Sequence, residues 1–130
     1  MQNLVKIAGR YFDVYITAVK RSHEITDGEN AGRTMPPQAL MIRDIIGTFI
    51  PYTITFETKK LAPGEYDALV ETLSQPVDSI SITMPYGQSE ISFDAYVTKV
   101  EDELLSNIHG IRRWGNLQVT FTPMAPNIKP

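Results

Sequence analysis

Alternation of apolar and polar residues is the feature that most constrains the fold of this chain. In residues 52–57, Tyr-Thr-Ile-Thr-Phe-Glu, every second side chain is a large apolar or aromatic one. Successive side chains of a β-strand point to opposite faces, so a strand here would bury one face and expose the other. Similar alternation recurs in residues 4–26, 77–84, 90–100 and 114–122. The pattern predicts a mostly β protein.

Only residues 63–74 have the period of an amphipathic helix. Tyr66, Leu69, Val70 and Leu73 form an apolar stripe at helical spacing, and Pro63 suits the first helical position. One helix provides little material for repeated β-α-β units. We therefore expect an antiparallel β-sandwich or small open barrel with one flanking α-helix at about residues 63–74.

Three segments are predicted to lie outside the alternating strands. Residues 27–38 are rich in turn formers and have no apolar period, which predicts a long loop. Residues 101–113 are predicted as a second loop, because Asn107, His109 and Gly110 interrupt them. Residues 123–130 contain three prolines and form a tail that is either flexible or docks on a neighbouring molecule. Since no linker divides the chain, we expect residues 1–130 to form a single domain.

Composition limits the classes of function. The 130 residues include no cysteine, which excludes disulfides, zinc–thiolate sites and cysteine nucleophiles. Twelve Lys and Arg against fifteen Asp and Glu give a net charge of −3, so there is no global basic field for nucleic acid. No apolar run approaches the roughly 20 residues of a membrane span. We expect a soluble protein made in the cytoplasm, with no membrane partner.

No pattern in the sequence indicates catalysis or metal binding. His23 and His109 lie in polar surroundings without the spacing of a metal site, and are predicted to be surface histidines. Residues 27–30 lack the spacing of a calcium loop, and no phosphate loop or nucleophile elbow is present. We therefore predict no enzyme activity, no catalytic residue, no metal site and no cofactor.

One basic and aromatic group has two interpretations. Arg112, Arg113 and Trp114 are consecutive, and two guanidiniums beside an indole could bind phosphate or stack on a base. Trp114 also begins a predicted strand, where a core or interface aromatic is ordinary. We take these residues as a candidate polar or nucleic-acid contact, without sequence-specific recognition.

The order of elements resembles that of small structural proteins of tailed-bacteriophage tails, of the tail-tube, distal-tail and tail-completion types, which are often found in prophages. The resemblance covers nearly the whole chain and lies in organisation rather than in a diagnostic motif. It rests on the strand at residues 11–26, the long polar loop, Met41-Ile42-Arg43-Asp44, Gly47-Thr48, the strand at 52–57, the Leu-x-Pro-x-Glu-Tyr-x-x-Leu helix at 61–69, the hairpin, and the last strand at 117–121.

The resemblance implies a β-sandwich whose subunits form rings, commonly hexameric, with strands lining a channel that would allow DNA to pass. It implies that the partners are further copies of this chain and other tail proteins, and that the protein is located in the virion tail after synthesis in the host cytoplasm. The loop at 27–38 would then be the assembly loop. Its candidate contact residues are Glu29, Asn30, Arg33, Met35 and Met41.

Two other classes of function stay open. The first is a soluble β-sandwich module that binds a ligand, peptide or protein in a cleft. The second is a small enzyme. Dependence of the assembly state on concentration would separate a self-assembling protein from a binding module.

Overall fold

The computed structural model of the chain describes residues 4–59 and 62–130. These residues form twelve β-strands and one α-helix. The elements in chain order are β1 (Lys6–Ile7), β2 (Arg10–Tyr11), β3 (Tyr15–Arg21), β4 (Glu24–Asp27), β5 (Gly32–Arg33), β6 (Met41–Ile42), β7 (Ile45–Phe49), β8 (Tyr52–Glu57), α1 (Pro63–Leu73), β9 (Ile80–Tyr86), β10 (Ser89–Tyr96), β11 (Glu101–Ile108) and β12 (Ile111–Pro123).

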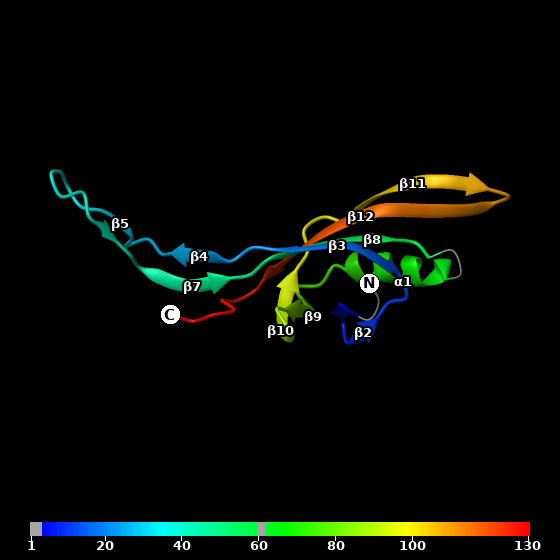
Figure 1. Ribbon diagram of the computed structural model, residues 1–130, viewed down its shortest axis with the longest axis horizontal. Helices are drawn as coiled ribbons and strands as arrows, with labels where there is room; N and C mark the ends of the chain where they lie inside the picture. The colour runs from blue at the N-terminus through cyan, green and yellow to red at the C-terminus, as the bar shows by residue number, and fades with distance from the viewer. Residues whose placement is uncertain (1–3, 60–61) are drawn as a thin grey trace.

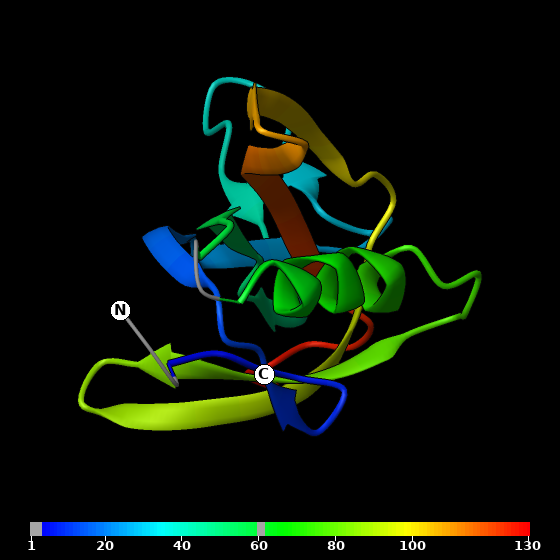
Figure 2. The ribbon, with the colours of Figure 1, turned by 90° about the vertical axis from the view of Figure 1, so that its right-hand side faces the viewer.

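The body of the molecule is one antiparallel sheet bent into two layers. Its strand order is β2-β1-β9-β10-β12-β8-β3, and β11 also pairs with β12. The 13-residue β12 joins the layers, because its last residues pair with β10 whereas its middle pairs with β8. Figure 2 shows the β9–β10 layer below, the β12–β8–β3 layer above and α1 between them. The prediction of a mostly β, antiparallel fold with one helix is confirmed, and the sheet is not closed into a barrel.

The alternating pattern of the sequence sets which faces form the core. Every second residue of β8, and of β12 from Gly115 onward, is buried, and the two sets pair in register, as in Val119 opposite Ile54. On α1, Tyr66, Leu69 and Leu73 are buried, while Val70 is partly buried against the same cluster. The helical stripe therefore packs on the sheet as predicted.

A long hairpin, which we call the first arm (residues 24–49), projects from one end of the body (Figure 1). It continues the β3–β8 pair outward through β4 paired with β7 and then β5 paired with β6. Residues 27–38, predicted as a long loop, are the distal part of this arm. Within them, Gly32 and Arg33 pair with Ile42 and Met41.

A second hairpin projects at the opposite end of the long axis (Figure 1). It is formed by β11 and the start of β12, and we call residues 104–114 the second arm. The prediction of a loop at residues 101–113 is wrong, because β11 pairs with β12 from Glu101 to Ile108. His109 and Gly110 have φ values of 53° and 78°, and two positive φ values are typical of the tight type I′ hairpin turn. Of the three residues that indicated a loop, His109 and Gly110 form a two-residue turn, and Asn107 pairs with Arg112 in the hairpin.

The C-terminal tail docks on its own chain. The backbone N–H groups of Asn127 and Ile128 donate to the Thr48 carbonyl oxygen at 2.9 and 3.1 Å, and the Thr48 N–H donates to the Ile128 carbonyl oxygen at 2.8 Å. Gly47 makes this approach possible, because a Cβ atom there would lie 2.7 Å from both Pro126 Cβ and the Ile128 oxygen. Residues 123–130 are therefore neither a free end nor, in this chain, an arm extended toward a neighbour.

Candidate interaction surfaces

The first arm presents a row of apolar side chains to solvent. Met35, near its tip, is 83 % exposed, which is unusual for so large an apolar residue. The predicted assembly residues Glu29, Asn30, Arg33, Met35 and Met41 all lie on this arm and are all exposed. The apolar residues of the arm that are more than 40 % exposed are Ile25, Met35, Leu40, Met41, Ile42, Ile45 and Ile46.

Hydrogen bonds within the first arm give it a defined shape. The Gly28 N–H donates to the Asp44 carbonyl oxygen at 2.6 Å, and the Thr34 N–H donates to the Leu40 carbonyl oxygen at 2.6 Å. The Arg43 Nε donates to an Asp27 carboxylate oxygen at 2.7 Å. The backbone polar groups are thus paired along the arm, whereas its apolar side chains lack a covering layer.

The second arm forms one wall of an apolar hollow of about 260 Å³. The hollow lies between this arm, the segment after β8 and the start of α1, and its lining includes Ile108, Ile111 and Pro63. Ile108 and Ile111 are 63 % and 68 % exposed, although they flank a well-formed turn. The sequence analysis missed this surface, although the isoleucines on either side of His109-Gly110 could have indicated a hairpin with an apolar tip.

Basic groups surround the same hollow. Arg112, Arg113 and Lys59 contribute to its lining. The Lys59 Nζ donates to an Asp13 carboxylate oxygen at 2.6 Å, and an Arg113 Nη lies 3.7 Å from a Glu57 carboxylate oxygen. Arg113 Nε is buried and has no hydrogen-bond partner within residues 4–59 and 62–130. The hollow is therefore apolar inside, and two of the three basic side chains in its lining, Lys59 and Arg113, lie against carboxylates.

Trp114 lies in a different environment from Arg112 and Arg113. It lines a hollow with Asp67, Glu71 and Asp102, so its surroundings are acidic. Adjacent strand residues point to opposite faces, which separates the indole from a neighbouring guanidinium. The structure thus does not bring the three residues together into one surface, as combined base stacking and phosphate binding would require.

A buried hydrogen bond connects α1 to the base of the second arm. The Tyr66 hydroxyl donates to an Asp102 carboxylate oxygen at 2.8 Å, and Tyr66 is almost completely buried. Burial raises the pKa of Tyr66 far above its ordinary value, and the hydrogen bond to the nearby Asp102 carboxylate raises it further. The phenol therefore stays protonated and holds β11 against the helix.

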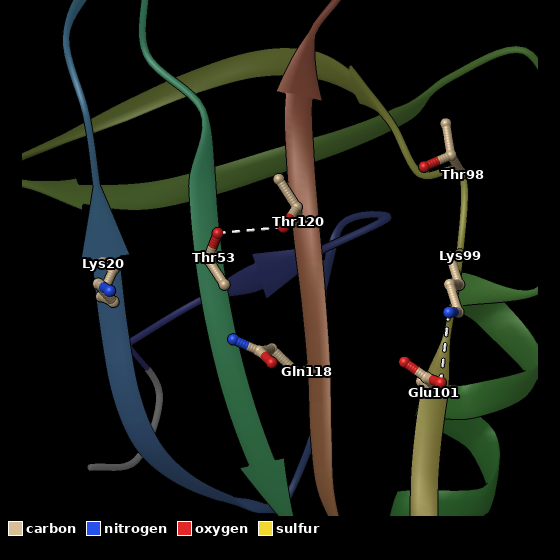
Figure 3. A pocket seen from close by; sticks show the side chains of 7 residues that line it. All are labelled: Lys20, Thr53, Thr98, Lys99, Glu101, Gln118 and Thr120. Atoms are coloured by element: carbon tan, nitrogen blue, oxygen red, sulfur yellow. Dashed lines mark hydrogen bonds and ion pairs between the residues drawn. The ribbon is translucent and has the colours of Figure 1, made fainter.

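The outer face of the β12–β8–β3 layer carries a polar hollow of about 380 Å³ (Figure 3). Side chains from three adjacent strands and from the segment leading into β11 point to the same side of the sheet. Thr53 and Thr120 hydroxyls lie 3.1 Å apart, and the Lys99 ammonium lies 3.3 Å from a Glu101 carboxylate oxygen. Hydroxyl, amide and ammonium groups of this kind can bind water or a polar ligand.

The described part of the chain contains no group of three or more His, Cys, Asp or Glu side chains placed to hold a metal ion. His23 lies near the Tyr86 ring, with centroids 6.0 Å apart, and His109 forms the turn of the second arm. Within the same residues, no helix has both the length and the apolar character needed to cross a membrane.

The chain matches no protein-family model, and no curated protein is significantly similar to it in sequence.

Proposed function

We propose that this protein is a non-enzymatic structural component of a phage or prophage tail that assembles with further copies of itself, and with other tail proteins, into rings or a tube. The observation that carries the proposal is the pair of arms at opposite ends of the body, both with exposed apolar side chains. Several large apolar side chains exposed on one projecting hairpin are typical of a site of protein association. The resemblance in organisation to phage tail proteins supports the tail as the place of assembly.

The strand edges of the body support self-assembly through strand contacts. Within the described residues, β3 and β11 each pair with one strand only, so they form the two edges of the β3-β8-β12-β11 layer. Edge strands present unpaired backbone groups to which another chain can add. β3 ends in Lys20 and Arg21, whereas β11 begins with Glu101, Asp102 and Glu103. The two edges thus carry opposite charges. This favours an assembly in which the β3 edge of one copy lies beside the β11 edge of the next.

The proposal predicts that the assembly state depends on concentration. Sedimentation velocity over a hundredfold range of protein concentration should show a shift from monomer to a larger species, and negative-stain electron microscopy should show rings or tubes. High salt should weaken the assembly if the charged edges contribute to it. An antibody against the chain should label the tails of induced phage particles. A monomer at every concentration, both alone and with the other tail proteins of the same phage, would contradict the proposal.

A binding module is the second candidate. The polar hollow over Lys20, Thr53 and Gln118 favours it, because this hollow is large enough for a small polar ligand or a peptide side chain (Figure 3). In that case a monomer would persist at all concentrations. A ligand would then shift the backbone amide resonances around the hollow without a change in mass.

A further inference from the structure

We infer that the first arm of one copy docks in the apolar hollow beside the second arm of the next copy, so that the copies join head to tail. This contact rests on the proposed self-assembly and specifies which two surfaces meet. The occupant of the hollow is thus a second copy of this chain.

The two surfaces match in apolar character. Met35 and Leu40 near the tip of the first arm are 83 % and 61 % exposed, and Ile108 and Ile111 beside the hollow are exposed to a similar degree. A flexible methionine side chain adapts to an irregular apolar hollow better than a branched one does. Docking would remove the apolar groups of both arms from water at the same time.

The two surfaces also have opposite charge. The first arm carries four carboxylates, those of Glu24, Asp27, Glu29 and Asp44, against two arginines, which gives it a net charge of −2. The second arm carries Arg112 and Arg113 with no carboxylate, which gives it a net charge of +2 if its histidine is neutral. Complementary charge steers two surfaces together and disfavours arm-to-arm contacts between like surfaces. In the distal part of the first arm, residues 28–42, Glu29 and Arg33 cancel, so the charge difference acts as the two molecules approach and disfavours another second arm as the occupant.

The placement of the arms makes the contact intermolecular. They project from opposite ends of the long axis, so the tip of the first arm does not reach the hollow of its own molecule (Figure 1). A contact between two different surfaces is heterologous, and repeated application gives either a closed ring or an open filament. An incomplete assembly would present a free first arm at one end and a free hollow at the other.

The experiment uses two variants that each lose one of the surfaces. Met35→Asp combined with Leu40→Asp alters the first arm, and Ile108→Asp combined with Ile111→Asp alters the hollow. All four side chains are exposed, so both variants should keep the circular dichroism and thermal midpoint of the wild type. Val77→Asp is the matched control, because Val77 is 56 % exposed and lies outside both arms.

Each altered variant alone should remain monomeric at concentrations where the wild type and Val77→Asp assemble, with association weakened about thirtyfold or more. An equimolar mixture of the two should form a one-to-one dimer and nothing larger. In that dimer the intact arm of one variant occupies the intact hollow of the other. Analytical ultracentrifugation measures both results.

A cross-link identifies the surfaces directly, because the chain contains no cysteine. Under mild oxidation, a Met35→Cys variant mixed with an Ile111→Cys variant should form a heterodimer. A mixture of Met35→Cys with Ser92→Cys, which places the second thiol on the body, should form far less.

The outcomes separate this contact from the proposed function. Two results would show that the arm-to-hollow contact is wrong although the protein does self-assemble. In the first, the wild type assembles but the mixture of altered variants stays monomeric. In the second, each altered variant assembles alone as the wild type does. A wild type that stays monomeric overturns both. A third outcome is that the wild type assembles only after another tail protein is added, and that the variant with the altered hollow still binds that protein. The first arm would then bind the other tail protein instead of a second copy of this chain.

Discussion

Replacement of Asn127 by alanine tests whether the C-terminal tail is an integral part of the fold. The Asn127 Oδ1 accepts a hydrogen bond from the Ile50 N–H at 2.8 Å, and Ile50 is completely buried. In Asn127→Ala that amide would lose its acceptor at a partly buried site. The neighbouring backbone hydrogen bonds between the tail and Thr48 should weaken as well, because the Asn127 side chain would no longer hold the tail in place.

A buried donor without a partner costs about 1–3 kcal/mol. With a urea dependence of about 2 kcal/mol per molar for a domain of this size, the unfolding midpoint should fall by about 0.5–1.5 M. Far-UV circular dichroism during urea unfolding measures the change. Asn127→Asp is the matched control, since a carboxylate keeps an acceptor oxygen in the same place, and it should stay close to the wild type at neutral pH.

Hydrogen exchange provides a local readout of the same change. The Ile50 amide should exchange much faster in Asn127→Ala than in the wild type or Asn127→Asp. Two results would refute the reasoning. One is an unchanged urea midpoint in Asn127→Ala, and the other is an equal loss of stability in Asn127→Ala and Asn127→Asp, which would show that the acceptor oxygen is not what matters.

Four further perturbations test other parts of the fold. Leu69→Ala, which truncates a fully buried side chain, should cost about 2–5 kcal/mol in the free energy of unfolding, whereas Glu71→Ala on the exposed face of α1 should change it by less than about 0.5 kcal/mol. Tyr66→Phe should lower stability at neutral pH by about 1 kcal/mol through loss of the bond to Asp102. The pKa of Tyr66 is raised in the folded state. The stability that its phenol contributes is therefore complete below the unfolded pKa of about 10 and is lost as pH rises above it. The urea midpoints of the wild type and Tyr66→Phe should converge in alkaline buffer. Gly47→Ala should release the tail and accelerate proteolysis of residues 124–130, because its Cβ would collide with Pro126. EDTA should leave the thermal midpoint unchanged, and a drop of many degrees would contradict a fold that needs no metal.

The buried faces of the body strands and of the helix could be predicted from the sequence alone. Alternation in residues 52–57 and 117–121 places the apolar side chains on one face, whatever the partner strand is. The stripe from Tyr66 to Leu73 does the same for the helix, and its face packs in the core. The helix, predicted at about residues 63–74 from the same stripe and from Pro63, spans Pro63–Leu73. These features depend on residues close together in the chain, so a local pattern is sufficient to predict them.

Where the local pattern is weak, the fold depends on contacts between segments that are distant in the chain. β11 begins with Glu101-Asp102-Glu103 and has no buried face, so its strand character comes from pairing with β12 rather than from its own periodicity. The tail is ordered by Thr48 and Gly47, which lie far away in sequence, and no pattern within residues 123–130 encodes that contact. The hollow at the second arm likewise joins Thr58 and Lys59 after β8, the start of α1 and the β11–β12 hairpin. Such features arise from contacts between residues that are distant in the sequence. The local pattern of one segment does not show which other segment it will pair with.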